Sequence, residues 1–237
     1  MEGIIRLFVN RDRDSLLIIG FISGLLISAF ILPSSLMDVF NSGPALWFKL
    51  ILALFLIQFT IYYIIKPVQK VVMNFNVIDF LILISIILVL LQSLFLNISI
   101  NKAVIFYLLI ITYYIIKILF SNINTSEKKF TYFTIVAIFS LVALISSTIG
   151  ICQIANILPS NNLYFKVTGN FKNPARFATY LSSLLPIPFC FYIIYQNKVP
   201  AIRHIKTITS FALLAGLLVL PSTYSRSSWL GLAVVIV

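Results

Sequence analysis

The stretch "FLILISIILVLLQSLFL", residues Phe80–Leu96, decides the class of protein to which this chain belongs. It is a continuous apolar run, without the alternation of apolar and polar residues that a half-buried strand shows. Only helices and closed barrels cross lipid, because every backbone N–H and C=O there needs a partner within the protein. Since strands of membrane barrels alternate, this run predicts a transmembrane helix.

Similar runs recur along the chain, and they predict an all-α, polytopic membrane protein with one transmembrane domain over residues 1–237. An eighth span begins at Trp229 and is cut off at Val237, so we expect the N-terminal part of a longer protein. We also expect Pro221 to end or kink the seventh span. The predicted complete spans are Ser15–Leu32, Ala45–Ile65, Phe80–Leu96, Ala103–Phe120, Phe130–Leu158, Phe177–Tyr195 and Ile208–Leu220.

The composition agrees with a membrane protein. Hydrophobic residues make up 61% of the chain and charged residues 10%, whereas about a quarter of the residues of a soluble domain are charged. The net charge is +11, but most cations sit in short loops between apolar runs, where they set topology. We therefore predict membrane lipid and no nucleic acid as a partner. Cys152 and Cys190 fall inside predicted spans, so we expect neither a disulfide nor a metal site.

The distribution of cations predicts the orientation of the chain. With the N-terminus in the cytoplasm, eleven Lys and Arg residues fall inside or at the inner boundary and six fall outside, which satisfies the positive-inside rule. The loop with Lys172 and Arg176 then lies on the outer face, as does the loop with Arg226.

Acidic residues are missing where these outer cations lie. No Asp or Glu follows Glu127, although that part of the chain holds nine Lys or Arg residues, and Asp38 is the one carboxylate expected on the outer face. An unpaired cation near the membrane points to a ligand. Phosphate suits the planar fork of arginine. Two simpler interpretations stay open: Arg226 snorkels to lipid headgroups, and Lys172 is solvated.

The neighbours of these cations favour a shaped site. Gly169, Asn173 and Pro174 are turn residues, which predicts a defined loop. Ser225 belongs to a group of hydroxyl residues that can complete a phosphate cradle with exposed N–H groups.

Two stretches carry a resemblance to a known family. "IGICQIANILPSNNLYFKVTGNFKNPARFATYLSSLLP", residues Ile149–Pro186, resembles the outer loop and following helix of the O-antigen ligase-like superfamily, with its T-G-x-F-x-N-P turn. "STYSRSSWLGL", residues Ser222–Leu232, resembles the second signature of that family, S-R before a Trp-containing helix. The two stretches occur in the family's order and at about its separation. The preceding spans match in number and character.

The resemblance implies a glycosyltransferase that moves a glycan from a polyprenyl diphosphate carrier to an acceptor hydroxyl. The superfamily acts on the outer face of the bacterial inner membrane. Its acceptors are lipid A-core, a growing glycan or a protein, and these imply roles in lipopolysaccharide or other polysaccharide biosynthesis. The resemblance needs no cofactor, and with so few outer carboxylates we expect no metal.

The resemblance also assigns residues. Arg226 matches the signature arginine that binds the carrier diphosphate, and Gly169, Asn170, Asn173 and Pro174 match the turn. Family members often have a second asparagine after the proline, but this chain has Ala175 and then Arg176. The predicted diphosphate-binding residues are Arg226, Arg176, Lys172 and Ser225.

The catalytic base is not among these residues. In the family a histidine comes from a later outer loop, so we expect no catalytic residue in this chain and no activity from residues 1–237 alone. The single histidine, His204, falls in a loop that we predict to be cytoplasmic.

Other functions remain open. One alternative is a polysaccharide polymerase of the same superfamily. Another is a transporter or flippase for an anionic lipid-linked glycan, which should carry charged or polar residues at mid-membrane. Gln58 and Gln92 are the only strongly polar residues near the centres of the predicted spans. A membrane scaffold without a ligand would have no reason to leave outer cations free of acids.

Overall fold

The computed structural model describes residues 12–27, 30, 39–65, 75–96, 100–195 and 200–236. Over these residues the chain is helical, with one long loop and no strand, so the all-α prediction is confirmed. Five described segments are long and apolar enough to cross a membrane, which makes this a multi-pass membrane protein. They are Leu46–Ile64, Val104–Asn122, Thr125–Ile154, Pro174–Ile194 and Ile202–Thr223.

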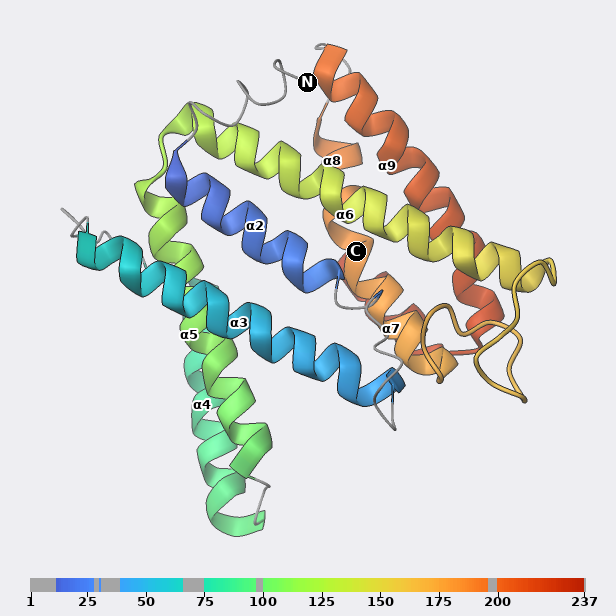
Figure 1. The fold of residues 1–237 in the computed structure, drawn as a ribbon, viewed down its shortest axis with the longest axis horizontal. Helices are drawn as coiled ribbons and strands as arrows, with labels where there is room; N and C mark the ends of the chain where they lie inside the picture. Colours follow the sequence, from blue (N-terminus) through green and yellow to red (C-terminus); the bar gives the residue numbers. More distant parts are fainter. Residues whose placement is uncertain are drawn as a thin grey trace. The chain divides into compact units, whose positions relative to one another are not determined.

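The helices fall into two compact units (Figure 1). The first unit holds the start of α2 (Arg13–Ile27), the second half of α3 (Val39–Ile65), α4 (Val77–Leu96) and α5 (Ile100–Asn122). The second unit holds the rest of α2 and α3, nearly all of α6 (Thr125–Ile154), and the helices that follow. These are α7 (Pro174–Leu184), α8 (Pro186–Ile194), α9 (Pro200–Val219), the 3₁₀ helix η2 (Leu220–Thr223) and α10 (Arg226–Ile236).

In the first unit, α4 and α5 form a hairpin of two adjacent helices (Figure 1). Asn76 and Asp79 cap the start of α4 reciprocally: the Asn76 N–H donates to the Asp79 carboxylate at 2.7 Å, and the Asp79 N–H donates to the Asn76 side chain at 3.1 Å. The same carboxylate accepts from the Lys117 ammonium at 2.5 Å, near the end of α5. This ion pair therefore ties the first turn of α4 to the last turns of α5.

In the second unit, a buried core joins α6, α7 and α9. Gly150 makes close approach possible, because a Cβ there would lie 2.7 Å from Val219 and 3.3 Å from the Phe177 ring. The buried hydroxyls of Ser140 and Thr209 meet at 2.9 Å and link α6 to α9.

The parts of α2 and α3 that belong to this unit are held by aromatic side chains. The Trp47 indole N–H donates to the Gly24 carbonyl at 2.8 Å, and the Tyr180 hydroxyl donates to the Leu26 carbonyl at 2.9 Å. Each bond satisfies the polar group of a partly buried aromatic side chain.

Some predicted span boundaries differ from the observed helices. The expected continuous span Phe177–Tyr195 divides at Leu185, because Pro186 and Pro188 have no N–H to donate to the preceding turn. Helix α6 begins at Thr125 and ends at Ile154, before Asn156 takes the left-handed conformation with φ 61°. Helix α9 ends at Val219, and Pro221 follows in η2, as the sequence predicts.

The Asp79–Lys117 pair generates a test of the hairpin. Replacing Lys117 by Met should lower the thermal stability of the protein in detergent, because the fully buried Asp79 side chain then loses its cationic partner. The double variant Asp79→Asn/Lys117→Met should recover much of the loss. Lys129→Met, at an exposed position of α6, should change little. Equal melting temperatures for the Lys117 and Lys129 variants would contradict a structural role for the pair.

Candidate functional site

The loop of residues 155–173 is organised around the side chain of Gln153. This buried carboxamide, in the last turn of α6, accepts from the backbone N–H groups of Thr168 at 2.9 Å and Gly169 at 2.8 Å. Its NH₂ group donates to the carbonyls of Pro159 and Gly169, both at 3.1 Å. One side chain thus joins the start and the end of the loop to the end of a membrane-crossing helix.

Short polar side chains complete the same loop. The Thr168 hydroxyl accepts from the Asn161 N–H at 3.2 Å and lies 3.2 Å from the Ser160 hydroxyl. The Asn161 amide donates to the Gly169 carbonyl at 3.2 Å, and the Asn162 amide donates to the Lys172 carbonyl at 2.9 Å. The backbone that carries Lys172 is therefore fixed to the first half of the loop.

Gly169 and Phe177 meet where the loop turns toward α7. Gly169 has φ 55°, and a Cβ at this position would lie 2.4 Å from the Phe177 ring. Both the left-handed conformation and the close approach favour glycine. Phe177 is 1% exposed, and Phe171 packs on it with 6.3 Å between ring centroids. The turn is thus closed by an aromatic side chain from the helix that it introduces.

Asn173 and Pro174 start α7. The Asn173 side chain accepts from the Ala175 N–H at 2.8 Å, and Pro174 occupies the first helical turn, where its missing N–H costs no hydrogen bond. Lys172 lies just before this cap and Arg176 lies within the first turn, so both cations are near the positive end of the α7 dipole.

The second motif surrounds another helix start. After η2, Tyr224 takes the left-handed conformation with φ 55°, and α10 begins at Arg226. The buried hydroxyl of Ser225 lies 2.9 Å from that of Ser228 and 3.4 Å from that of Ser227. The cluster of hydroxyl groups thus gathers around the first turn of α10.

The two motif segments pack against each other. Helix α7 contacts both α10 and η2, and the Thr179 and Ser228 hydroxyls lie 3.4 Å apart. Arg176 stands three residues before Thr179, and Arg226 stands two residues before Ser228. At about 1.5 Å of rise per residue, each arginine Cα lies within a turn of this contact. Segments about 50 residues apart in the sequence therefore place their helix starts side by side.

The three predicted cations lie on the surface of the protein. Lys172, Arg176 and Arg226 are all exposed. Among the described residues, no ion pair or hydrogen bond is made by their side chains, and the segment 128–237 contains no acid that could make one. The site therefore consists of cations at two neighbouring helix N-termini, with a net electrostatic preference for an anion.

The other predicted residues are distributed as follows. Ser225 is buried with its hydroxyl directed to its own helix, and Asn170 is half-buried with no side-chain hydrogen bond in the described structure. His204 is exposed in the first turns of α9, whereas η2 and Arg226 follow the far end of that helix. Asp38 lies outside the described residues. Within the described ranges, no three His, Cys, Asp or Glu residues are grouped to hold a metal.

Sequence reasoning did not identify Thr179, which looks like an ordinary small residue of a membrane helix. Ser228 belongs to the hydroxyl group that the sequence pointed out around Arg226, but its contact with α7 was not predicted. The resemblance includes a glutamine at the end of the span, which is Gln153, but its four hydrogen bonds to the loop were not predicted.

Comparison with known proteins does not name a family. No protein-family description, curated protein or solved structure matches this chain.

Replacing Gln153 by Leu should destabilise the loop. The buried N–H groups of Thr168 and Gly169 would lose their acceptor, at a cost of about 1–3 kcal/mol for each group. We expect faster proteolytic cleavage within residues 155–173 and a lower melting temperature. Gln58→Leu is the matched control, because Gln58 is exposed on α3. Equal cleavage rates in the two variants would show that Gln153 does not hold the loop.

Gly169→Ala should destabilise the protein by more than about 1 kcal/mol, which is the cost of the left-handed conformation alone. The clash with Phe177 adds to this cost. Gly231→Ala should have no such effect, because a Cβ there meets open space. Thermal unfolding of the two variants checks the difference, and a neutral Gly169→Ala would exclude the observed turn.

Proposed function

We propose that this protein is a membrane glycosyltransferase of the O-antigen ligase type. It moves a glycan from a polyprenyl diphosphate carrier to an acceptor hydroxyl on the outer face of the bacterial inner membrane. The acceptor is lipid A-core, a growing glycan or a protein side chain. The observation that carries the proposal is the packing of the two motif segments, which brings together the helix starts of Arg176 and Arg226 from a part of the chain, residues 128–237, that contains no Asp or Glu.

The proposed reaction explains the chemistry of the cations. Breaking the bond between the sugar and the phosphate leaves negative charge on the carrier diphosphate. Arg226 and Arg176 supply planar forks for phosphate oxygens, and Lys172 supplies a point charge. Preorganised donors of this kind stabilise charge that develops in a transition state, by about 3–4 kcal/mol for one donor in studied enzymes.

Placing several cations near one another is electrostatically unfavourable unless an anion binds there. Cations on neighbouring helix starts repel one another as they approach, and an anion that binds among them removes that repulsion. The nearby turn is held by Gln153, and α7 is held to α10, so the cations are carried on fixed backbone rather than on free loops. Such preorganisation reduces the entropy lost when a ligand binds.

The acceptor hydroxyl must lose a proton, and we assign that role to none of the described residues. His204 is poorly located, since the helix between it and the start of η2 at Leu220 extends over about 24 Å, at about 1.5 Å per residue. A scheme with two carboxylates is also poorly supported, because residues 128–237 contain no Asp or Glu.

The topology in this proposal has seven complete spans and the start of an eighth, with the N-terminus in the cytoplasm. Both motif segments then face outward.

A transporter or flippase would need polar groups along an internal path, but Gln58 and Gln92 are exposed on α3 and α4. A polymerase of the same superfamily shares the diphosphate chemistry and differs in the acceptor.

Arg226 is the residue on which the proposal can be tested. Arg226→Ala should lower glycan transfer by the intact protein at least about 100-fold, as removal of one donor to a developing oxyanion does. Arg226→Lys should restore little, because a point charge does not replace the bidentate fork. Lys172→Ala and Arg176→Ala should weaken carrier binding more modestly. Arg203→Ala, an exposed arginine of α9, is the control. Transfer by Arg226→Ala at the rate of Arg203→Ala would refute the proposal.

The orientation of the chain in the membrane can be checked by labelling introduced cysteines in spheroplasts, whose inner membrane is intact. An impermeant maleimide added outside should reach cysteines at the exposed positions Asn161 and Ser227. It should not reach a cysteine at Lys129, which is exposed at the other end of α6. The natural Cys152 and Cys190 are replaced by Ala in all samples. Labelling at position 129 but not at 161 would reverse the assignment.

A further inference from the structure

The loop of residues 155–173 exposes large apolar side chains directly after a membrane-crossing helix. Leu163 is 98% exposed, Tyr164 is 90% exposed and Ile157 is 72% exposed. Leu158 and Phe165 are exposed to a lesser extent, at 42% and 43%. Single exposed apolar residues are ordinary, but a group of large ones marks a contact with a partner or with a membrane. These five side chains make up the apolar surface of the loop.

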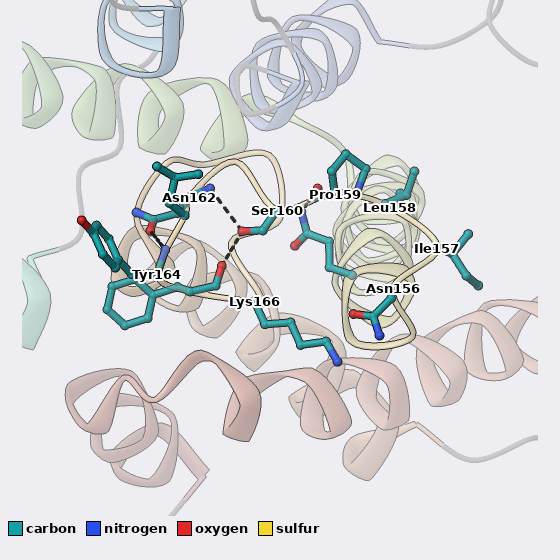
Figure 2. Close-up of a pocket in the computed structure, with 11 residues that line it drawn as sticks. Asn156, Ile157, Leu158, Pro159, Ser160, Asn162, Tyr164 and Lys166 are labelled. Carbon is teal, nitrogen blue, oxygen red and sulfur yellow. Dashed lines mark hydrogen bonds between the residues drawn. The ribbon is translucent and has the colours of Figure 1, made fainter.

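The same five side chains line one cavity in the loop, with a volume of about 580 Å³. Figure 2 shows Ile157 and Leu158 beside the end of α6, whereas Tyr164 lies on the other side of the cavity. The apolar surface is therefore spread along the loop. Such a distribution fits contact with an extended apolar medium better than enclosure of one small molecule.

Backbone hydrogen bonds fix the first part of this surface to α6. The N–H groups of Ile157 and Leu158 both donate to the Cys152 carbonyl, at 2.8 and 3.2 Å. Asn156 turns the chain for these bonds by taking the left-handed conformation, as is common just after the end of a helix. Ile157 and Leu158 are thus one hydrogen bond away from the last turn of α6.

The exposed side of α6 is itself apolar. Leu141 and Ile145 are both exposed, and residues four apart share one face of a helix. Ile151, closer to the loop, is exposed as well. In a helix that is long and apolar enough to cross a membrane, exposed side chains of this kind face lipid. The apolar surface of the loop therefore begins where the lipid-facing surface of α6 ends.

Short polar side chains present the second part of the apolar surface. The Asn162 side chain accepts from the Tyr164 N–H at 2.8 Å, and the Ser160 hydroxyl donates to the Phe165 carbonyl. Backbone polar groups next to Leu163 are thus satisfied within the loop. This economy is what contact with a bilayer requires, because unsatisfied backbone groups are costly near hydrocarbon.

Lys166 adds a positive charge beside this surface. It is exposed and lines the same cavity, and residues 128–237 contain no Asp or Glu to pair with it. A lysine can cover apolar surface with its methylene groups while its ammonium meets lipid headgroups. Tyrosine also favours the boundary between hydrocarbon and water, because its ring is apolar and its hydroxyl is polar. The residue types therefore fit a bilayer interface with anionic headgroups.

We propose that this loop rests in the membrane interface beside the end of α6. Ile157, Leu158 and Leu163 contact acyl chains, Tyr164 lies at the level of the headgroups, and Lys166 pairs with the phosphates of anionic lipids. Lipid is favoured over a second protein chain because the surface continues the lipid-facing side of α6 and carries a cation. This contact is separate from the proposed glycan transfer and does not depend on it.

Spin labels on introduced cysteines measure the depth of the loop directly. The intact protein, with Cys152 and Cys190 replaced by Ala, is reconstituted in vesicles of phosphatidylcholine and phosphatidylglycerol. Labels at Leu163→Cys and Ile157→Cys should collide more with oxygen than with a water-soluble nickel complex, at depths of about 5–10 Å below the headgroups. Ile145→Cys is the control for a lipid-facing position. Asn161→Cys, an exposed polar position of the same loop, should collide more with nickel.

The contribution of Lys166 is measured with the same label at position 163. Omitting the anionic phosphatidylglycerol should move this label toward water, and Lys166→Ala should remove the difference between the two vesicles. Lys129→Ala, at an exposed position of α6, should leave the difference unchanged. A difference that persists in Lys166→Ala would refute the pairing of Lys166 with lipid phosphate.

Two outcomes would overturn the membrane contact. Labels at positions 157 and 163 with the nickel accessibility of position 161 would place the loop in water. Labels shielded from both oxygen and nickel would show that protein, such as a second copy of this chain, covers the surface instead of lipid. Since Leu163 is almost fully exposed, its replacement leaves the packing of the loop intact. No glycan donor or acceptor enters the measurement, so its result is independent of the proposed function.

Discussion

The carboxamide of Gln153 determines how the loop of residues 155–173 in the second unit is built. It lies in the last turn of α6 and makes four hydrogen bonds to backbone groups of the loop that follows. At the end of an apolar helix, a buried amide with incomplete bonding would be costly, so the loop must return to it. That return brings Gly169 over Phe177 and sets the position at which α7 begins. The orientation of Lys172 and Arg176 thus depends on a residue that carries no charge.

A second constraint joins this loop to the end of the chain. Helices α7 and α10 touch through Thr179 and Ser228, two small hydroxyl residues that allow close approach between helices. The contact is one turn from the start of each helix, where unpaired N–H groups and the helix dipole both favour an anion. Arg176 and Arg226 add full charges to the same end. Helix dipoles and cations therefore favour an anion at the same place, and residues 128–237 contain no acid to neutralise them. This is the physical reason to expect a phosphate-bearing ligand.

Hydrophobic runs predicted much of the helical architecture, and particular residues explain where they did not. The run Phe80–Leu96 agrees with α4 to within three residues. Helix α9 starts earlier than predicted, because Arg203 and Lys206 lower the hydropathy of its first turns, which are nevertheless helical. The Lys206 ammonium lies 4.8 Å from the centre of the Tyr192 ring. Pro186 and Pro188 explain the break at Leu185, because they remove hydrogen bonds of the preceding turn. A hydropathy pattern does not detect this effect, since it counts only apolar character.

The candidate site was less accessible from the sequence. The cations and the turn residues could be selected because charge and turn chemistry are local properties. The Thr179–Ser228 contact depends on how two helices pack, which a single sequence does not reveal. For the same reason the cavity beside Lys166 was not predicted, since its walls come from hydrogen bonds across the loop.

The central claim is that Arg176 and Arg226 act on one diphosphate, and a double-mutant cycle measures this most directly. Calorimetry would give the affinity of a short-chain polyprenyl diphosphate for the intact protein, for Arg176→Ala, for Arg226→Ala and for the double variant. The account predicts a coupling free energy of at least about 0.5 kcal/mol between the two arginines, and none between Arg203 and Arg226. Additive losses for Arg176 and Arg226 would contradict a shared site.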